Sequence, residues 1–376
     1  MTDIYFNIKK VARYISIYGL IWTLFKIAGR TRKFPIGIFF LPKKDGVTVG
    51  IIGCGQFSYS TTAQFLYRKL GRVVVACLDV NKDSLLSFSK SLRVRKSYQD
   101  FEKFKKEKLD VVYIASNHFT HTEYAIKSIE AGIKNIYIEK PVSVNKEQLL
   151  SLAKAYRSTN ASIYAGFNRP FSDAILNLKQ NFQEINQSFF VNMIVWGHTI
   201  DENHWYRDPK EGSRISGNLG HWIDLMIHLL FWKENKPDYY DVAIVWQDTD
   251  KCVDENFVVT VKTSNGDIFT LQFGAKINPF DGVSEFIDFQ CEDFCARIID
   301  FIKMELDTGS GKSVKSFYPK DAGHKAAVLQ PFKQKNQRNF EEVLYSTSFT
   351  ILLGNAFREK VSALRIHSND IKSMYE

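Results

Sequence analysis

The stretch TVGIIGCGQFS, residues 48–58, decides the fold that we expect for this chain. A run of β-branched residues leads into Gly53, which indicates a buried strand, and apolar residues at helical spacing follow the stretch. Between the two, Gly53 permits a tight turn, and Gly55 has no Cβ, so a phosphate group can approach the backbone N–H groups at the helix N-terminus. A strand, a glycine turn and a helix in this order predict a dinucleotide-binding unit.

The next apolar run, Val73–Leu78, ends in Asp79. An acidic side chain at the end of the second strand accepts hydrogen bonds from the adenosine ribose hydroxyls of a dinucleotide. A carboxylate there also repels a 2′-phosphate, so we expect NAD rather than NADP as the cofactor. The alternative is a glycine-rich turn in some other α/β protein, which the acid at the second strand end disfavours.

The composition indicates a globular protein of more than one domain. The chain has 376 residues, of which 45% are apolar and 24% are charged, which is enough for two domains and an extension. Its five cysteines contain no CxxC pair, so neither a disulfide framework nor a metal site is expected. This use of cysteine is typical of a reducing cytoplasm.

The net charge of +9 is concentrated at the start of the chain. Residues 1–44, called the arm below, hold nine basic residues and one acidic residue, whereas the rest of the chain holds 41 basic and 40 acidic residues. The body therefore carries almost no net charge. It also has no recognisable nucleic-acid-binding module, so nucleic acid is not an expected partner.

Within the arm, the uncharged segment YISIYGLIWTLF, residues 14–25, is too short to span a bilayer as a helix. On a helix, apolar side chains gather on one side, which predicts an amphipathic helix flanked by basic clusters. Either the helix packs on its own body or on a second subunit, or it lies in the interface of an anionic membrane. A signal peptide is not expected, because no small-residue cleavage site precedes the second basic cluster.

Strand and helix patterns alternate through residues 45–166. Apolar runs at 111–115 and 135–139 indicate buried strands, with a helix at 122–131 between them. Alternation of this kind predicts an α/β fold with a doubly wound parallel Rossmann sheet. Ser116 and Asn117 follow the first of these strands, at the carboxyl edge where such sheets bind ligands. His118 and His121 in the same turn also suit capping or surface positions.

Glu139, Lys140 and Pro141 follow directly on the next strand. Proline fixes the backbone just after the lysine, so the ammonium group projects from the carboxyl edge of the sheet. The glycine turn lies at the same edge. We therefore interpret Lys140 as a site residue rather than as a solvated surface charge.

Residues 167–376 have a different pattern. Longer strand-like runs occur at 189–196, 239–246, 257–262, 268–273 and 285–290, with helices at 220–231 and 339–363. They predict an α+β domain built on a large, mostly antiparallel sheet. Aromatic and basic side chains precede the first helix, where they suit a sugar ring with an attached phosphate or else form a packed corner; they are Trp205, Tyr206, Arg207 and Arg214.

Several local patterns together resemble the glucose-fructose oxidoreductase, inositol dehydrogenase and rhizopine-catabolism family, called Gfo/Idh/MocA. They are VGIIGCGQF, IASNHFTHTEYAI, EAGIKNIYIEKPVS, YAGFNRPFS and GSRISGNLGHWIDLMIHLL, within a resemblance that covers residues 46–365. The resemblance implies a nicotinamide-dependent oxidoreductase that acts on a hydroxyl group of a sugar or cyclitol. The last pattern is most similar to a branch associated with polysaccharide biosynthesis.

The resemblance also implies roles for individual residues. Lys140 and His221 stand where the family has its active-site lysine and its catalytic histidine. Asn168 and Arg169 match the GFNR segment beside nicotinamide and substrate, and His121 matches the cofactor-side histidine. The expected cofactor-binding residues are Gly53, Gly55, Gln56, Phe57, Asp79, Ser116, Asn117, His121, Glu139, Lys140 and Asn168. The expected substrate-binding residues are Arg169, Trp205, Arg214, Asn218 and His221.

One departure concerns the expected catalytic histidine. Many family members carry an aspartate four residues before it, and here that position is Gly217, followed by Asn218. A histidine without a carboxylate partner is a weaker base with a less firmly fixed tautomer. We still expect His221 to accept the hydroxyl proton while Lys140 donates a hydrogen bond to the developing alkoxide.

The expected function is NAD-dependent oxidation or reduction of a sugar that is nucleotide-linked and used in making a surface glycan. One alternative is an enzyme that acts on a free sugar or cyclitol in catabolism. The other alternative is a cofactor-binding scaffold or regulator without turnover. The basic arm favours the nucleotide-linked sugar, because glycan assembly takes place at the cytoplasmic membrane face. The expected location is therefore cytoplasmic, with a peripheral position on the inner membrane face in the case that the arm binds lipid, and the resemblance implies a homo-oligomer.

Overall fold

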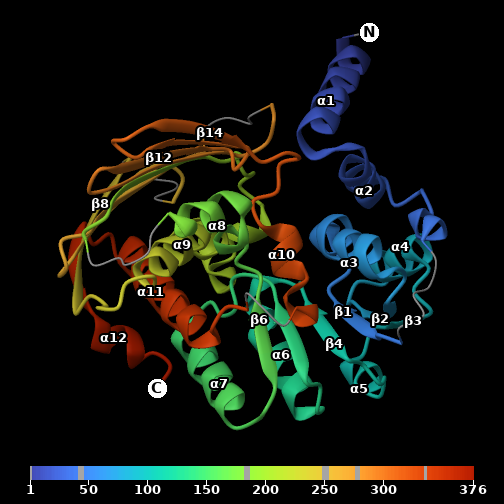
Figure 1. Ribbon diagram of the computed structural model, residues 1–376. Helices are drawn as coiled ribbons and strands as arrows, with labels where there is room; N and C mark the ends of the chain where they lie inside the picture. The colour runs from blue at the N-terminus through green and yellow to red at the C-terminus, as the bar shows by residue number, and fades with distance from the viewer. Residues whose placement is uncertain (1, 41–45, 182–186, 248–253, 276–279, 334–336) are drawn as a thin grey trace.

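The structure is a computed structural model that describes residues 2–40, 46–181, 187–247, 254–275, 280–333 and 337–376. Two β-sheets dominate it, a six-stranded sheet in the first half of the chain and a nine-stranded sheet in the second, with helices around and between them (Figure 1). This arrangement confirms the predicted α/β fold with a second, mostly antiparallel sheet.

All neighbouring strands of the first sheet are parallel, in the order β3-β2-β1-β4-β5-β6. The strand order reverses between β1 and β4, so the loops that leave these strands at their carboxyl ends open a crevice there. Every residue of β1 and β4 is buried, because both faces of the sheet are covered. The strands are β1 Val49–Ile52, β2 Val74–Leu78, β3 Lys96–Tyr98, β4 Val111–Ile114, β5 Asn135–Ile138 and β6 Ser162–Ala165.

Helices alternate with these strands as the sequence predicted. The helix after the glycine turn begins as a π-helix, η2 Ser58–Ala63, and continues as α3 Gln64–Leu70. The hydroxyl of Ser58 donates a hydrogen bond of 2.6 Å to the carbonyl oxygen of Gly53, which ties the helix start to the turn. The other helices of this domain are α4 Lys82–Leu92, α5 Phe101–Phe104, α6 His121–Glu130 and α7 Lys146–Arg157.

The second sheet has the order β14-β13-β12-β11-β7-β10-β9-β8-β15. Only β7 and β10 pair in parallel among its described strands, and the other neighbours are antiparallel. The five predicted strands are confirmed as β7 Phe190–Trp196, β8 Tyr239–Trp246, β9 Phe257–Thr263, β10 Ile268–Gly274 and β11 Ser284–Cys291. Sequence analysis missed β12 Phe294–Ile299, β13 Lys303–Asp307, β14 Lys312–Ser316 and β15 Ala363–His367.

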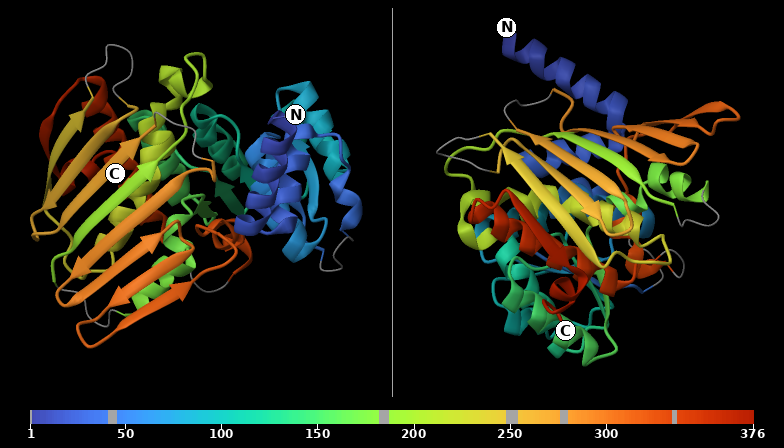
Figure 2. Two further views of the ribbon diagram at one scale, coloured as in Figure 1. Left: turned by 90° about the horizontal axis from the view of Figure 1, so that it is seen from above. Right: turned by 90° about the vertical axis from the view of Figure 1, so that its left-hand side faces the viewer.

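Helices cover one face of this sheet and leave the other face open (Figure 2). The covering helices are α8 Asp173–Gln180, α9 Gly220–Leu230 and α11 Phe340–Arg358, and their apolar residues share one hydrophobic core with the inward-facing residues of the strands. The predicted tail helix at 339–363 is too long. It ends at Arg358 because the chain turns at Lys360, which has a φ of 55°, and the next segment pairs with β8 as an edge strand before the short helix α12 Ser368–Lys372.

The chain returns to the first domain just before α11. The helix α10 His324–Val328 and the short 3-10 helix η8 Gln330–Phe332 pack beside the parallel sheet. The hydroxyl of Tyr113 on β4 donates a hydrogen bond of 2.5 Å to the carbonyl oxygen of Val328. Residues late in the sequence therefore pack against the first domain.

The arm forms two helices rather than the single helix predicted. They are α1 Thr2–Tyr18 and α2 Leu20–Thr31, and Gly19 separates them with a φ of 79°, a backbone conformation that favours glycine. Trp22, Phe25 and Ala28 of α2 are buried against the first domain. The structure thus has α2 packed on its own body, while residues 41–44, with two of the arm's lysines, lie outside the described part.

The opposite side of α2 remains apolar and exposed. Leu20, Ile21, Leu24 and Ile27 are each at least 40% exposed. Among the described helices, none is both long enough and apolar enough to cross a membrane.

Candidate active site

The glycine turn is open toward the crevice. Gly53 has a φ of 91°, and a Cβ there would lie 2.4 Å from the carbonyl oxygen of Ala115, so only glycine fits between β1 and β4. A Cβ at Gly55 would meet no atom within 4 Å. The space that a pyrophosphate needs in front of the turn is therefore free of protein atoms, and the turn fits a dinucleotide.

Asp79 lies in the same crevice, at the position where the sequence predicts the adenosine ribose. One carboxylate oxygen accepts a hydrogen bond of 2.7 Å from the backbone N–H of Cys54, and the other accepts one of 2.8 Å from that of Asn81. These bonds hold the carboxylate at the carboxyl end of β2, where the sequence predicted it. The acid is thereby fixed beside the glycine turn.

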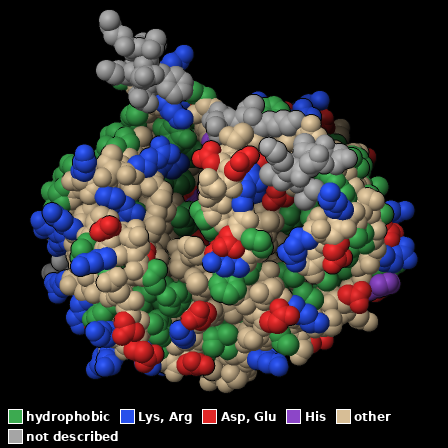
Figure 3. Space-filling view, turned by 180° about the vertical axis from the view of Figure 1, so that it is seen from behind, with side chains coloured by type: hydrophobic (Ala, Val, Ile, Leu, Met, Phe, Trp, Pro, Cys, Tyr) green, Lys and Arg blue, Asp and Glu red, His purple; other side chains and the backbone are tan. Residues whose placement is uncertain are grey.

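A cavity of about 500 Å³, called the dinucleotide cavity below, runs from Asp79 to Lys140. Every predicted cofactor-binding residue except Asn168 lines it. The further lining residues include His118, Trp205 and Tyr206, of which sequence analysis proposed none as a cofactor contact. In the space-filling view, a groove separates the two halves of the molecule, and Lys and Arg side chains are prominent over the first-domain half (Figure 3).

Two buried titratable residues, Glu139 and His121, line this cavity. Burial raises the pKa of Glu139 to about 7, although its carboxylate accepts hydrogen bonds from the Tyr137 hydroxyl at 2.9 Å and from the Lys140 N–H at 3.3 Å. Burial lowers the pKa of His121 to about 4. The ring nitrogens of His121 lie 2.8 Å from the carbonyl oxygen of Pro141 and 3.0 Å from that of Ser116, so a neutral ring donates to one of them.

Lys140 reaches from the end of β5 to the second domain. Its ammonium group donates a hydrogen bond of 2.7 Å to the carbonyl oxygen of Gly217. Gly217 belongs to a π-helical turn, η7 Ile215–Leu219, which continues directly into α9. His221 lies in the first turn of α9, so this hydrogen bond holds the lysine one helical turn from the histidine.

His221 lines a second cavity of about 540 Å³, called the substrate cavity below, together with the other predicted substrate residues Arg169, Trp205, Arg214 and Asn218. This cavity adjoins the dinucleotide cavity, because Trp205 and Tyr206 line both. Lys140 thus lines the dinucleotide cavity and His221 the adjoining substrate cavity, and the hydrogen bond from Lys140 to Gly217 links the two.

The electrostatic surroundings of His221 favour its neutral form. Burial lowers the pKa of His221 well below its ordinary value, and the positive charges of Arg169 and Lys140 lower it further. Its Nδ1 is buried and has no hydrogen-bond partner among the described residues. The expectation that this histidine lacks a carboxylate partner is therefore consistent with its surroundings in the structure.

The structure supplies a reason for glycine at position 217. A Cβ there would lie 2.7 Å from the Tyr206 ring and 3.0 Å from the His118 ring. His118 cannot move aside easily, since it is buried and its Nδ1 lies 3.0 Å from the carbonyl oxygen of Glu211. His118 is therefore not the surface or capping residue considered from the sequence. The two rings occupy the space that an aspartate side chain would need.

Arg169 and Asn168 act as a pair. Arg169 is buried, forms an ion pair with Glu285, and donates a hydrogen bond of 3.0 Å to the side-chain oxygen of Asn168. Asn168 in turn donates one of 2.7 Å to the carbonyl oxygen of Ala322. Asn168 lines neither cavity, so the structure does not bring it to the other predicted cofactor residues and instead has it orienting Arg169.

Arg214 and Arg207 differ in their surroundings. The guanidinium of Arg214 is buried beside the substrate cavity and donates one hydrogen bond of 2.7 Å to the carbonyl oxygen of His198, while its Nε and Nη1 have no partner among the described residues. Arg207 instead forms an ion pair of 2.5 Å with Glu255. Arg214 is thus the residue of this loop with donors to spare for a ligand.

Sequence analysis missed three residues around the site: His198, which lines the substrate cavity, Glu285, which pairs with Arg169, and His324, which lies beside Asn168. They come from segments far apart in the sequence that carry no motif of their own. The sequence offers a signal for two of them, since His198 and Glu285 lie next to predicted strand ends. The contact between residues 169 and 285 joins two segments far apart in the sequence, so tertiary packing decides it.

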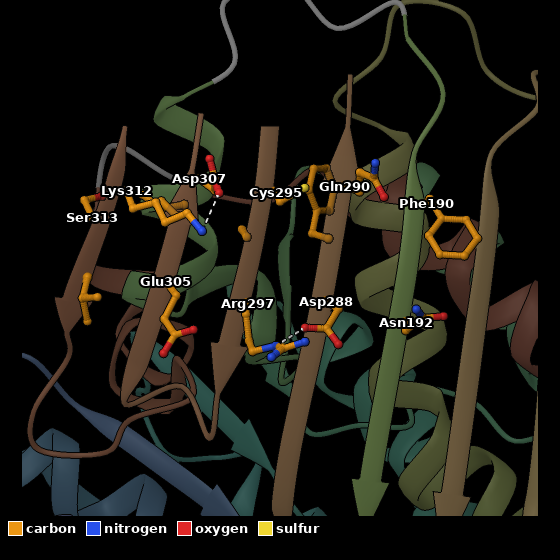
Figure 4. A pocket seen from close by; sticks show the side chains of 14 residues that line it. Phe190, Asn192, Asp288, Gln290, Cys295, Arg297, Glu305, Asp307, Lys312 and Ser313 are labelled. Atoms are coloured by element: carbon orange, nitrogen blue, oxygen red, sulfur yellow. Dashed lines mark hydrogen bonds and ion pairs between the residues drawn. The ribbon is translucent and has the colours of Figure 1, made fainter. Parts of the chain in front are cut away.

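Another cavity, of about 530 Å³, lies on the open face of the nine-stranded sheet and far from these residues (Figure 4). Its side chains project from five neighbouring strands, and two ion pairs, Arg297 with Asp288 and Lys312 with Asp307, neutralise charges on it.

Among the described residues, no group of three or more histidine, cysteine or carboxylate side chains is arranged to hold a metal ion.

Comparison with known proteins agrees with the geometry of the crevice. Residues 47–167 match the family model GFO_IDH_MocA, described as "Oxidoreductase family, NAD-binding Rossmann fold". Over these residues the first domain is thus similar to the NAD-binding Rossmann domain of that family. This matched region ends at the carboxyl edge of β6, two residues before Arg169.

Curated relatives match about half of this chain. Oxidoreductase P35 of Formosa agariphila is 26% identical over 218 residues, which cover 52% of this chain and 66% of the relative. The myo-inositol 2-dehydrogenase of Thermotoga maritima is 27% identical over 189 residues, which cover 48% of this chain and 52% of the relative. The chain thus spans about half to two thirds of the length of these relatives.

The likeness in fold extends over most of the chain. A crystal structure of a UDP-N-acetylglucosamine 3-dehydrogenase from Acidithiobacillus ferrooxidans aligns with a TM-score of 0.66, at 16% identity, over 82% of this chain and 97% of the other. The nine-stranded sheet and its helices are therefore part of a known two-domain architecture.

Proposed function

We propose that this chain is an NAD(P)-dependent oxidoreductase that transfers a hydride between the nicotinamide and a secondary hydroxyl group of a sugar or cyclitol. The observation that carries the proposal is the hydrogen bond from Lys140 to the carbonyl oxygen of Gly217. It joins the carboxyl edge of the dinucleotide-binding sheet to the helix that bears His221, at the border of two adjoining cavities.

In this proposal the bound nicotinamide accepts or supplies the hydride. The protein handles the proton. His221, which is neutral near pH 7, accepts the proton of the substrate hydroxyl as general base. Lys140 donates a hydrogen bond to the oxygen as it becomes an alkoxide and stabilises the negative charge. For reduction of a ketone the protonated histidine returns the proton.

NAD rather than NADP is the proposed cofactor. Both oxygens of Asp79 are held by backbone N–H groups in the dinucleotide cavity, so the carboxylate cannot turn away from a 2′-phosphate without losing these bonds. A fixed negative charge at the ribose repels the phosphate of NADP. Titration of NADH and NADPH by quenching of protein fluorescence tests this, with tighter binding of NADH expected.

The proposed substrate is an anionic, nucleotide-linked sugar used in surface glycan synthesis. It is supported by Arg214, whose guanidinium has two nitrogens without a partner among the described residues beside the substrate cavity. The myo-inositol 2-dehydrogenase among the relatives favours the alternative, a free cyclitol or sugar in catabolism. Turnover with nucleotide sugars but not with inositols would separate the two.

A cofactor-binding scaffold without turnover is the alternative from a different class. It is supported by Gly217 and by the missing partner of His221 Nδ1, because a histidine in such positive surroundings is a weak base. Tight NADH binding with no turnover on any substrate of the panel would favour this alternative.

The test combines identification of the ligand with mutation. Mass spectrometry of molecules that co-purify with the protein nominates substrates, and NADH fluorescence then follows turnover with UDP-, GDP- and CMP-sugars and with inositols. Lys140→Met and His221→Ala are expected to abolish turnover while NADH binding persists. Wild-type turnover by either variant would contradict the proposal.

We propose further that the protein is peripheral on the inner membrane face through the arm. The exposed row Leu20, Ile21, Leu24 and Ile27 lies near the exposed basic residues Lys9 and Lys33, a combination that suits an anionic lipid surface. Flotation with phosphatidylglycerol vesicles is expected to recover the wild-type protein and to lose a variant carrying Ile21→Glu and Leu24→Glu. Equal recovery of both would contradict membrane binding.

A homo-oligomer is proposed through the open face of the nine-stranded sheet. Phe190 and Trp196 on β7 are 46% and 48% exposed there, and the neighbouring charges are already paired with each other. A second copy of the same face would cover these rings. Sedimentation is expected to give an oligomer for the wild type and a monomer for Phe190→Glu.

A further inference from the structure

A fourth cavity, of about 470 Å³ and called the arm cavity below, lies where the arm meets both domains. It shares Gln56 and Phe57 with the dinucleotide cavity, and it shares Arg169 and His198 with the substrate cavity. The arm cavity therefore adjoins both the substrate cavity that holds His221 and the dinucleotide cavity. Nothing in the function proposed above uses this space.

The arm closes the outer wall of this cavity by bridging the two domains. On the second domain, Arg13 forms an ion pair of 2.8 Å with Asp281, and the backbone N–H of Lys320 donates a hydrogen bond of 2.8 Å to the carbonyl oxygen of Ile17. On the first domain, the Trp22 ring lies 5.1 Å from the Phe65 ring. Figure 1 shows α2 above α3, with α10 close by.

The charges that line the arm cavity leave two cations without an anionic partner. Its charged residues are Lys26, Arg30, Arg169, Lys320 and Glu285, with His198 and His324 beside them. Arg169 is paired with Glu285, and Lys320 with Asp300 at 3.1 Å. Neither Lys26 nor Arg30 forms an ion pair with a described carboxylate, and their four-residue spacing puts both on one side of α2.

Aromatic rings surround the ammonium group of Lys26. It lies 3.9 Å from the centre of the Tyr18 ring, 5.1 Å from that of Tyr14 and 5.2 Å from that of Trp22. Burial lowers the pKa of Lys26 to about 8. The indole N–H of Trp22 is buried and has no hydrogen-bond partner among the described residues. The Lys26 ammonium group is thus largely removed from water and has no anionic partner among the described residues, and the Trp22 N–H beside it is a free donor. An anionic ligand would satisfy both groups.

We infer that the arm cavity binds the diphosphate of a nucleoside diphosphate-linked sugar, with Lys26 and Arg30 as its cationic ligands. The inference rests on the proposed function, since it takes the sugar to lie in the substrate cavity beside His221. The diphosphate passes Arg169 to reach α2, and the tyrosine rings of α1 offer a surface on which a base stacks. The arm is then part of the substrate site, and its basic side chains bind substrate as well as lipid.

Binding of nucleoside diphosphates to the full-length protein tests this inference. Isothermal titration with UDP, GDP, CDP and dTDP is made with NADH saturating, so that no nucleotide enters the dinucleotide cavity. At least one of the four is expected to bind the wild type. A double variant, Lys26→Met with Arg30→Gln, is expected to weaken that binding at least about tenfold, because each lost charge-assisted hydrogen bond is worth about that factor or more.

The matched control is a double variant, Lys9→Met with Lys33→Gln, in which Lys26 and Arg30 are unchanged. It removes the same charge from exposed arm positions outside the cavity and is expected to bind the nucleotide within about twofold of the wild type. Lys26→Arg, which keeps the cation, is expected to retain most of the affinity, and thermal unfolding shows whether each variant is folded.

Several results would overturn the inference. They are a wild type that binds none of the four nucleotides, equal weakening by the cavity and control variants, and inorganic pyrophosphate binding as tightly as any nucleotide, which would mean an ion site only. The proposed function fails separately. Tight nucleotide binding without any hydride transfer would refute the oxidoreductase and support nucleotide binding in the arm cavity. Turnover of free sugars with no nucleotide binding would support the oxidoreductase and refute nucleotide binding in the arm cavity.

Discussion

Replacement of Lys140 by methionine is the perturbation that bears most directly on the proposed chemistry. Methionine keeps the length of the side chain and removes its charge. The change deletes the hydrogen bond of 2.7 Å to the carbonyl oxygen of Gly217. It also deletes the donor that would face the alkoxide, and loss of one such donor costs about 10²–10³ in kcat, or about 2.7–4 kcal/mol. We expect a fall in kcat of this size with NADH affinity nearly unchanged.

The same variant has an effect that needs no substrate. The charge of Lys140 lowers the pKa values of His221, His118, His121 and Glu139. Removing a positive charge favours the protonated form of each group, so all four pKa values are expected to rise. Histidine C–H resonances followed by NMR from pH 8 down to the acid limit of the folded state report the three imidazole groups directly.

Lys134→Met is the matched control. Lys134 is exposed and precedes β5, at the opposite edge of the sheet from Lys140. It is expected to leave the histidine resonances and kcat unchanged. Titration curves in Lys140→Met that superimpose on those of the wild type would refute the electrostatic argument, and a wild-type kcat would refute the catalytic one.

Three further predictions concern carboxylate groups. Glu285→Ala leaves the buried guanidinium of Arg169 unpaired and is expected to lower the free energy of unfolding by about 3–5 kcal/mol, measured by urea denaturation, with a loss below about 1 kcal/mol contradicting it. The pKa of Glu139 is raised from 4.5 to about 7, so between these pH values the native state binds more protons than the unfolded state, and this group's contribution to stability falls as pH rises. Glu139→Gln removes this loss and is expected to gain stability over the wild type by up to about 1.4 kcal/mol per pH unit between pH 4.5 and pH 7. Parallel curves of unfolding free energy against pH for the two proteins would exclude this. Asp79→Ser removes the fixed carboxylate and is expected to raise the affinity for NADPH relative to NADH at least about tenfold in fluorescence titrations, whereas an unchanged ratio would show that the carboxylate does not discriminate.

The first domain could be predicted from the sequence because its signals are local. The glycine turn, the acid after the second strand and the lysine before Pro141 each depend on a few consecutive residues, and their position at strand ends was enough to bring them to one edge of a parallel sheet. The structure has them lining one cavity. The missed strands β12 to β15 lie in short, charged segments, whose pairing depends on neighbouring strands rather than on apolar runs.

The amino-acid sequence by itself determined the Rossmann turn, the basic arm and the residue types of the site. Only the tertiary structure decided why position 217 is glycine, since the rings of His118 and Tyr206 that fill its space come from other loops. It also decided that Lys26 of the arm faces a cavity shared with Arg169 and Lys320. The physical reason is that helical periodicity describes one element at a time, whereas a cavity is formed by side chains that are brought together only when separate elements pack.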